Sequence, residues 1–182
     1  MKGFSKYIPE LNPQRVANNF NFYVSMDQST IYKKVIKEQN KYSILLQEPE
    51  HFGFFMQVLN GEVFQSPIKK HIVHGFDLES NGSYKSQFIQ GLRLDLIQPN
   101  QLSEIECSDI LTQCQVLLQA LIESNSKQEL WGDWALHNLI YSPVENCIFN
   151  IDLEGFLTYK PLPEWANLSH ITNWIEELMA RL

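Results

Sequence analysis

Short runs with a β pattern dominate the first half of the chain. Residues 20–25 (FNFYVS), 30–37 (TIYKKVIK) and 71–76 (HIVHGF) are rich in β-branched and aromatic side chains, which is typical of strands. A fourth run, 84–97, starts in the same way and is interrupted at Gly91. This half of the chain is therefore expected to form a small, mostly antiparallel sheet.

Helical periodicity begins within this half and becomes dominant after it. At 48–64, Pro49 suits a first helical turn, and the apolar residues at helical spacing are Phe55, Val58 and Leu59. A longer helix is predicted from Ser103 to about 123–126, with one apolar face made of Ile110, Cys114, Leu117 and Leu121. The second half should therefore be mainly helical.

A short hairpin and a closing helix complete the pattern. The runs at 138–141 and 147–152 read as short strands, and the turn-forming residues SPVEN between them predict that they pair as a hairpin. Asn167 or Ser169 is available to cap a helix at 169–182, whose apolar face comprises Ile171, Trp174, Ile175, Leu178 and Leu182. The hairpin is thus a β element expected among helices.

Polar residues with chemical capacity lie at both ends of this hairpin. Asp133 follows Gly132 in the segment that enters it, Asn138 lies five residues later, and Asp152 closes the second strand. Folding the hairpin can bring both ends to one edge, where the oxygen atoms of these side chains would suit Mg²⁺ together with substrate phosphates. One carboxylate could instead accept a proton from an attacking hydroxyl. The pattern indicates phosphoryl transfer.

Composition narrows the class of protein. The chain has 182 residues, 44% of them apolar and 12% aromatic, which suits one compact unit with a real core. Its 14 Lys and Arg against 21 Asp and Glu give a net charge of −7, which argues against non-specific binding to nucleic acid or anionic lipid. Three cysteines without C-x-x-C spacing are expected to be reduced core residues. With neither a signal-peptide pattern nor about 18 consecutive apolar residues, the protein is expected to be cytoplasmic.

The order of helix, G-D-x-x-x-x-N, hairpin and NIDLEGF (150–156) resembles the catalytic half of the protein-kinase-like superfamily. It is most similar to the branch with aminoglycoside and choline phosphotransferases, where Asp-x-Glu often replaces Asp-Phe-Gly. The resemblance implies that Asp133 orients or deprotonates the acceptor, while Asn138 and Asp152 hold Mg²⁺ at the nucleotide phosphates. Glu154 matches the acidic position of the Asp-x-Glu variant and is assigned to the same metal site.

The resemblance also implies a division of the chain into two lobes. Residues of about 15–90 would form the N-lobe and about 92–182 a truncated C-lobe, within a single domain. The segment 88–91 is similar to the hinge, where backbone groups from Phe88 to Gln90 would hold the adenine of ATP.

The strand at 30–37 looks like the one that carries the phosphate-binding lysine of this superfamily. Alternation along the strand favours Lys34, with Lys33 as the alternative. Glu50, or else Glu48, would pair with that lysine from the following helix.

Three departures from the family pattern stand out. Trp131 occupies the place of the usual His before Gly-Asp, and its indole cannot accept hydrogen bonds as an imidazole can. Residues 22–32, which lead up to the two candidate lysines, contain no Gly, so a turn with longer side chains would replace the Gly-rich loop. The chain also stops one helix after the hairpin, and the helices that usually bind the acceptor are not expected.

These observations predict an α+β, protein-kinase-like fold with two lobes: a small antiparallel β lobe, and a minimal helical lobe that carries the catalytic hairpin. ATP and Mg²⁺ would lie between them. The expected function is ATP-dependent phosphotransfer to a hydroxyl, more in keeping with a small molecule than with a protein. The alternatives are a pseudokinase that binds a nucleotide or a protein partner, and a protein Ser/Thr kinase. No nucleic acid and no membrane are expected as partners.

Overall fold

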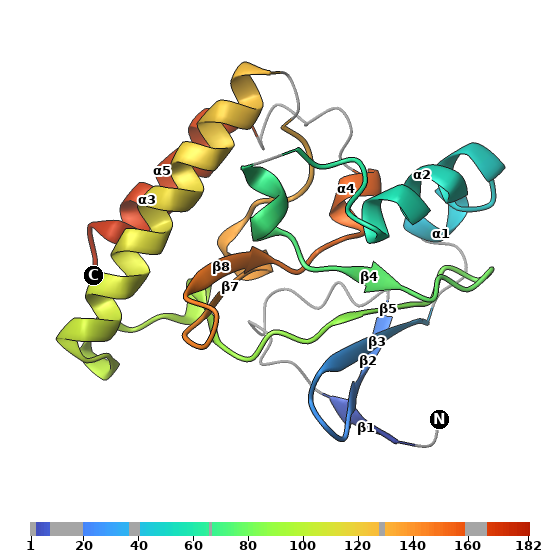
Figure 1. Ribbon diagram of the computed structural model, residues 1–182, viewed down its shortest axis with the longest axis horizontal. Coiled ribbons are helices and arrows are strands. Elements are labelled where there is room, and N and C mark those ends of the chain that lie inside the picture. Colours follow the sequence, from blue (N-terminus) through green and yellow to red (C-terminus); the bar gives the residue numbers. More distant parts are fainter. Residues whose placement is uncertain (1–2, 8–19, 37–40, 66, 128–129, 159–166) are drawn as a thin grey trace. The chain divides into compact units, whose positions relative to one another are not determined.

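The computed structural model describes residues 3–7, 20–36, 41–65, 67–127, 130–158 and 167–182 (Figure 1). The chain forms two compact units, the first from Met1–Glu62 with His74–Phe88, and the second from Val63–Val73 with Ile89–Leu182. Each combines β structure with helices, so the predicted α+β class, with an antiparallel sheet and several helices, is confirmed. None of the helices in the described part of the chain is long and apolar enough to cross a membrane.

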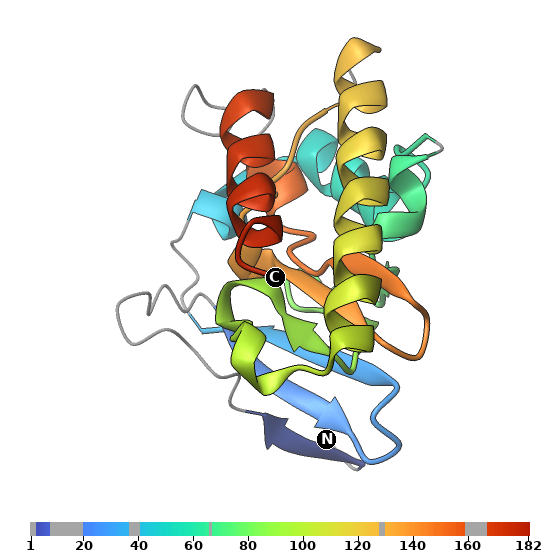
Figure 2. The ribbon, with the colours of Figure 1, turned by 90° about the vertical axis from the view of Figure 1, so that its left-hand side faces the viewer.

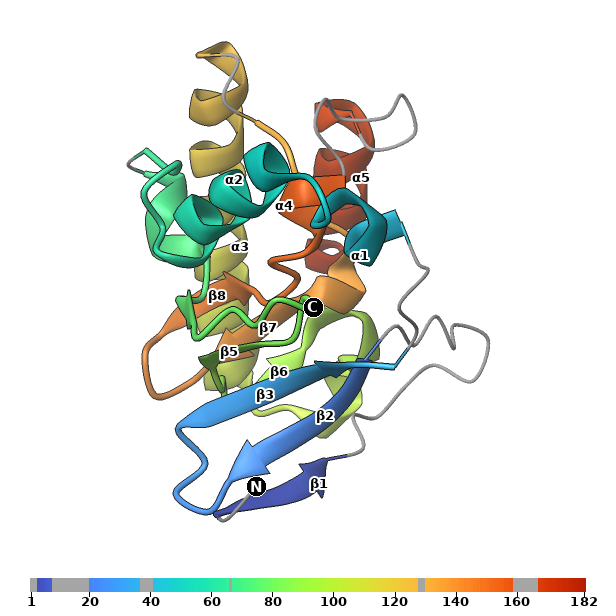
Figure 3. The same cartoon turned by 90° about the vertical axis from the view of Figure 1, so that its right-hand side faces the viewer.

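The first unit contains a five-stranded antiparallel sheet in the order β1-β2-β3-β5-β4 (Figure 3). Its strands are β1 (Phe4–Tyr7), β2 (Phe20–Ser25), β3 (Thr30–Val35), β4 (Gly75–Phe76) and β5 (Tyr84–Gln87). The strands predicted near 20–25 and 30–37 are confirmed. The sequence did not indicate β1, which pairs with β2 at the edge of the sheet.

The strand predicted at 71–76 is wrong for most of its length. A 3₁₀ turn, η1 (Ile68–His71), precedes an isolated bridge at Ile72, and only Gly75–Phe76 pair in the sheet of the first unit. Two tertiary hydrogen bonds explain the difference. The Nδ1 atom of His71 donates to the carbonyl of Ile148 over 2.8 Å, and the amide of Val73 donates to the carbonyl of Asn150 over 3.3 Å. The residues up to Val73 are therefore bonded within the second unit, to which they belong, instead of continuing a strand.

Two helices complete the first unit, α1 (Lys41–Leu45) and α2 (Pro49–Leu59). The second is the helix predicted at 48–64, with Pro49 in its first turn. Aromatic rings join these helices to one face of the sheet, with centroids 5.2 Å to 6.1 Å apart among Phe20, Tyr42, Phe55 and Tyr84. All four side chains are buried and form the core of this unit.

The second unit is built on a three-stranded antiparallel sheet in the order β6-β7-β8. The strands are β6 (Leu92–Arg93), β7 (Leu139–Ser142) and β8 (Cys147–Asn150), and the last two form the predicted hairpin. Three short 3₁₀ turns, η2 (Leu94–Leu96), η3 (Pro99–Gln101) and η4 (Leu136–Asn138), and a short helix, α4 (Gly155–Thr158), connect the elements. The sequence had not indicated α4.

Two long helices of the second unit lie side by side (Figure 2). In α3 (Glu104–Ser126) the side chain of Ser103 accepts from the amide of Glu106, whose carboxylate accepts from the amide of Ser103, which forms a capping box. In α5 (Leu168–Met179) the cap is Asn167 and not Ser169. The predicted apolar positions that are fully buried are Ile110, Cys114, Leu117, Leu121, Ile171, Ile175 and Leu178. Both helices are therefore confirmed.

The cysteines are free thiols, but only Cys114 is a core residue. Burial raises the pKa of its thiol to about 12. Cys107 and Cys147 are half-buried, so the expectation that all three lie in the core is wrong for these two.

Candidate active site

Asp133 lies in the loop before η4 and is only 9% exposed. Its Oδ1 atom accepts a hydrogen bond from the amide of Ala135 over 3.1 Å, which fixes the orientation of the carboxylate. The preceding Gly132 has φ +93°, and a Cβ there would lie 2.4 Å from the ring of Phe156. Only glycine fits this turn without strain, because both the backbone angle and the aromatic ring exclude a side chain.

Asn138, the last residue of η4, joins the loop of Asp133 to the end of the hairpin. Its Nδ2 atom lies 3.3 Å from the carbonyl oxygen of Asp133 and 3.5 Å from Oδ2 of Asp152. Its own carbonyl accepts from the amide of Ile151 over 3.0 Å. The structure thus brings together the three residues that the spacing of the hairpin had placed at one edge. Because the amide nitrogen is turned toward the two aspartates, the Oδ1 atom is the ligand that Asn138 could offer to a cation.

The sequence did not single out Asn150, which makes a second link between the same two segments. It is fully buried at the end of β8. Its Nδ2 atom donates to the carbonyl of Asp133 over 2.9 Å, and its Oδ1 atom accepts from the amide of Asp152 over 2.9 Å. The signal was present in the sequence as an asparagine within the apolar run CIFNID, since a buried amide on a strand needs partners.

Gly155, the first residue of α4, packs against both aspartates. A Cβ at this position would lie 2.4 Å from Oδ2 of Asp152 and 3.1 Å from Cβ of Asp133. The absence of a side chain here is what gives the Asp152 carboxylate its room. Glu154, the neighbouring residue, is half-exposed, and its carbonyl accepts from the amide of Thr158 over 3.1 Å.

These residues fit a hard divalent cation. Two carboxylates and a carboxamide supply oxygen atoms, which are the ligands that Mg²⁺ prefers, and Gly155 leaves space at Asp152 that a Cβ would fill. Among the residues that the structure describes, no cluster of three or more His, Cys, Asp or Glu side chains is placed to hold a metal ion. Such a site would depend on phosphate and water for its remaining ligands, as Mg²⁺ sites usually do.

Trp131, which precedes Gly132 and Asp133 in the sequence, belongs to an aromatic cluster beside this loop. Its ring stacks on Phe64 at 5.9 Å, and its carbonyl accepts from the indole Nε1 of Trp134 over 2.9 Å. Phe156 contacts both Phe64 and Trp134 edge to face, at 4.8 Å and 5.7 Å. The cluster supports the Asp133 loop by packing, which is a role that an indole can fill.

The two candidate lysines of β3 lie in different surroundings. Lys33 is only 5% exposed, and its Nζ atom lies 5.3 Å from the centroid of the Tyr84 ring. Its strand neighbours Phe22 and Tyr84 place it on the face of the sheet that the aromatic core covers. Lys34 points to the opposite face and is exposed. Burial therefore favours Lys33 as the candidate phosphate-binding lysine, although alternation along the strand had favoured Lys34.

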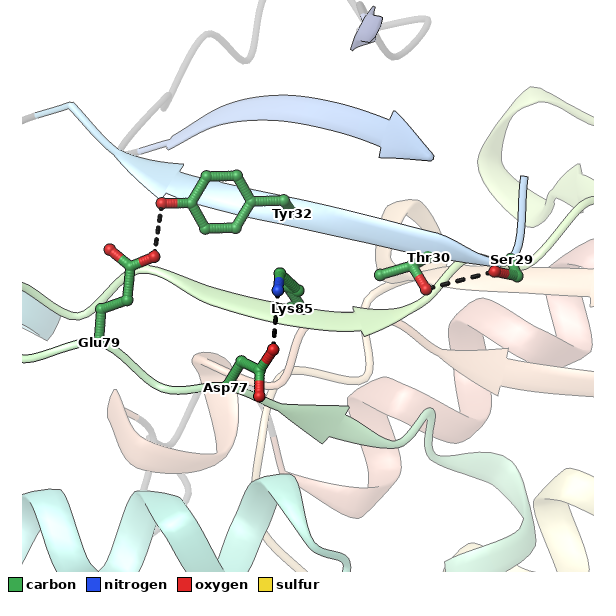
Figure 4. Close-up of polar contacts among 6 residues, drawn as sticks. All are labelled: Ser29, Thr30, Tyr32, Asp77, Glu79 and Lys85. Carbon is green, nitrogen blue, oxygen red and sulfur yellow. Dashed lines mark hydrogen bonds and ion pairs between the residues drawn. The ribbon is translucent and has the colours of Figure 1, made fainter. Parts of the chain in front are cut away.

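The opposite face of the sheet carries polar pairs (Figure 4). The hydroxyl of Tyr32 donates to Glu79 over 2.9 Å, and Lys85 forms an ion pair with Asp77 at 2.7 Å. Burial, and after it the hydrogen bond to Glu79, raise the pKa of Tyr32. Lys34 is on this face, so its surroundings are those of a solvated polar surface.

The two candidate glutamates lie at the start of α2. Glu48 pairs with His51 at 3.0 Å, and Glu50 is exposed in the first turn. Within the described residues, no ion pair joins Lys34 to either glutamate.

The residues of the expected hinge fall at the change between the units. Phe88 ends the first unit, and its amide donates to the carbonyl of Ser29 over 2.9 Å. Gln90 is exposed near the start of the second segment of the second unit. In the first unit, a cavity of about 220 Å³ is lined by Ser5, Val24, Ser25, Met26, Gln28 and Phe88.

The turn between β2 and β3 contains no glycine and occupies the place at which the sequence lacked a Gly-rich loop. Its side chains close it: Ser25 donates to Asp27, and Asp27 accepts from the amide of Ser29 over 3.1 Å. These bonds lower the pKa of Asp27, the bond from Ser25 being the largest cause. Gln28 has φ 55° at the tip. Hydrogen bonds from serine and aspartate side chains therefore stabilise this turn, which contains no glycine.

No family model matches the chain, and no curated protein matches it either. The solved structures that match include the aminoglycoside phosphotransferase APH(3'')-Id from Streptomyces rimosus. The two chains are 13% identical, the match covers 98% of this chain and 85% of that chain, and the TM-score is 0.44. A likeness this distant does not establish an activity.

Proposed function

We propose that this chain has a kinase-like fold and transfers a phosphoryl group from ATP, with Mg²⁺, to a hydroxyl of a small molecule. The observation that carries this proposal is the cluster of Asp133, Asn138 and Asp152, which hydrogen bonds hold together across the ends of a hairpin. Paired carboxylates and a carboxamide in this arrangement are the parts that phosphoryl transfer needs.

The metal side of the proposed site consists of Asp152 and Asn138, with Glu154 as a further acidic residue close to them in the chain. When bound, Mg²⁺ would neutralise charge on the nucleotide phosphates. Asp152 supplies negative charge, and Asn138 supplies a neutral oxygen. Gly155 leaves free the space beside Oδ2 of Asp152 that a Cβ would fill.

The acceptor side is Asp133. One of its oxygen atoms is engaged by the amide of Ala135, which holds the carboxylate in one orientation. The other oxygen would orient the acceptor hydroxyl and take its proton. Because the side chain is largely buried, these interactions would be stronger than in water.

The first unit would contribute to nucleotide binding. Lys33 would contact the phosphates, since its enclosed position on the core face limits competition from water; Lys34 remains the alternative. Phe88 and the backbone up to Gln90 would hold the adenine. The cavity at Phe88 is smaller than the roughly 300–1,000 Å³ of pockets that enclose drug-sized ligands, so it suits one ring system of a larger molecule. Glu50, or Glu48, would pair with the lysine.

A pseudokinase that binds nucleotide without transferring phosphate is the second candidate. The turn between β2 and β3 favours it, because side-chain hydrogen bonds close this turn, and it contains no glycine to lie against phosphates. The two candidates differ at Asp133, which a nucleotide-binding protein does not need. A protein hydroxyl as acceptor is a further alternative to a small molecule.

Thermal unfolding with nucleotide tests the proposal. ATP with Mg²⁺ should raise the melting temperature more than ATP with a chelator, and at a ligand concentration of 100 times Kd the stabilisation is about 2.7 kcal/mol. Asp152→Asn should abolish the Mg²⁺-dependent part, while Asp133→Asn should preserve it. Asp109→Asn, at an exposed position on α3, is the matched control for a lost negative charge.

Turnover then separates the two candidates. An active phosphotransferase should lose about 10²–10⁴-fold in rate with Asp133→Asn, followed as ATP hydrolysis and then with a panel of amino alcohols and sugars. Binding of Mg²⁺-ATP without turnover above the Asp133→Asn background would establish the pseudokinase instead. If millimolar ATP with Mg²⁺ does not stabilise the protein, both the phosphotransferase and the nucleotide-binding pseudokinase are ruled out.

A further inference from the structure

Asn150 joins more segments than any regular strand pairing requires. On β8 it lies opposite Leu139 of β7, and its carbonyl accepts from the amide of Val73 over 3.3 Å. Its side chain then reaches the carbonyl of Asp133 and the amide of Asp152, both at 2.9 Å. One fully buried residue therefore contacts the strand partner, the segment after η1, and the two aspartate segments.

A carboxamide is the side chain that these two contacts require. The carbonyl of Asp133 needs a donor, and the amide of Asp152 needs an acceptor, so the group that meets both must carry one of each. Aspartate has the same shape but offers two acceptors, one of which would face the carbonyl of Asp133. Serine is too short to span both groups. An apolar residue would leave both main-chain groups without the bonds that the buried asparagine provides.

The carbonyl oxygen of Asp133 is shared with Asn138. Both asparagine amides point to this one atom, Asn150 at 2.9 Å and Asn138 at 3.3 Å. Asn138 also lies 3.5 Å from the Asp152 carboxylate. A change at Asn150 would therefore shift the main chain of Asp133 and the placement of Asn138 together, although Asn150 contacts neither carboxylate.

We propose that Asn150 is the positioning residue of this site: its carboxamide sets the separation of the Asp133 and Asp152 main chains, and so the placement of the metal-side ligands. This inference rests on the proposed function. Residues that orient metal ligands in this way typically change metal affinity by 10- to 100-fold when they are substituted. Asn150 would therefore affect metal-dependent nucleotide binding without touching metal or nucleotide.

The test compares Asn150→Asp with Ser142→Ala. Ser142 is buried at the far end of the same hairpin, where its hydroxyl accepts from the amide of Glu145 over 3.3 Å, so it controls for loss of stability in the hairpin. Metal binding to the ATP-bound protein is measured with Mn²⁺ by paramagnetic resonance or with Mg²⁺ by calorimetry. ATP binding without metal is measured in the presence of a chelator. Asn150→Asp should weaken metal binding to the ATP-bound protein by about 10- to 100-fold. Its affinity for ATP without metal, and both properties of Ser142→Ala, should stay close to wild type.

Hydrogen exchange in the wild-type protein tests the same proposal if Asn150→Asp fails to fold. In wild-type protein the amide of Asp152, which lies outside regular structure, should exchange with deuterium as slowly as the amides of β8, because it is bonded to Asn150. Exchange as fast as in exposed loops would overturn the positioning role. So would a folded Asn150→Asp protein whose metal affinity matches that of Ser142→Ala. If wild-type protein itself shows no metal-dependent ATP binding, the proposed function fails, and with it the effect of Asn150 on metal.

Discussion

Gly155 gives the sharpest test of the site, because its replacement adds one methyl group at a known place. The Cβ of Gly155→Ala would lie 2.4 Å from Oδ2 of Asp152. Real Cβ atoms essentially never come closer than 3.0 Å to another heavy atom of this kind. Either the carboxylate or the start of α4 has to move by at least 0.6 Å, the difference between these two distances. Movement of α4 is limited by Asp133, whose Cβ would lie only 3.1 Å from the added methyl group.

The expected magnitude follows from this crowding. Overpacking by one methyl group typically costs 1–3 kcal/mol, and in a chain of this size each kcal/mol lowers the melting temperature by about 2–4 °C. Gly155→Ala should therefore melt about 2–12 °C below wild type. A misplacement of about 1 Å in a catalytic group can reduce rate by about 10²-fold, so Mg²⁺-dependent ATP binding and turnover should fall further than stability alone explains.

Gly53→Ala is the matched control for this measurement. Gly53 lies inside α2, is exposed, and has no heavy atom within 4 Å of an added Cβ. The same substitution there should stabilise the helix by about 0.5–1 kcal/mol, a rise of roughly 1–4 °C. Both variants are compared by thermal unfolding with ATP and Mg²⁺, and with ATP and a chelator.

One outcome would contradict this role of Gly155. If Gly155→Ala melts within 1 °C of wild type and keeps the full Mg²⁺-dependent stabilisation, the carboxylate of Asp152 does not need the space that Gly155 provides. A loss of stability with unchanged Mg²⁺ dependence would place Gly155 in the packing of α4 and remove it from the metal side of the site.

Three further outcomes are expected. Lys33→Ala should weaken ATP binding while Lys34→Ala should not, as measured by calorimetry, because only Lys33 is enclosed on the core face; the reverse result would return the phosphate role to Lys34. Burial lowers the pKa of His71 from 6.5 to about 4, against the opposing effect of its bond to Ile148. The folded protein then resists a proton that the unfolded chain accepts, so the free energy of unfolding should fall by about 2 kcal/mol between pH 7 and pH 5. His71→Asn, which can keep the bond to Ile148, should flatten this slope in denaturant titrations, and an unchanged slope would show that other groups cause it. Gly132→Ala, at φ +93° and against the Phe156 ring, should lower the melting temperature by more than Gly53→Ala raises it.

The local elements could be predicted because their causes lie within a few residues. The helix α3 begins after Ser103 because the hydroxyl of Ser103 accepts from the amide of Glu106 and the carboxylate of Glu106 accepts from the amide of Ser103, a contact that spans three positions in the sequence. The hairpin formed where turn residues separate two short apolar runs, and its length brought Asn138 within reach of Asp152.

Other features depended on partners far away in the chain. The run at 71–76 has the composition of a strand, yet His71 and Val73 are held by the main chain of Ile148 and Asn150, 77 positions from each of them. No local pattern could show this, because the competing hydrogen bonds exist only after the second unit has folded. Composition favoured a strand, and tertiary contacts overrode it.

The site divides in the same way. The sequence alone placed Asp133, Asn138 and Asp152 at the two ends of one hairpin, which can bring them to the same edge. Only the tertiary structure showed that Asn150 ties the two aspartate segments together and that Gly155 must lack a side chain. It also showed which lysine of β3 is buried, because alternation assigns two faces to a strand but cannot say which face the aromatic core will cover. Whether a side chain is buried, and whether two backbones approach closely, depends on which segments pack together, and these contacts form only when the whole chain folds.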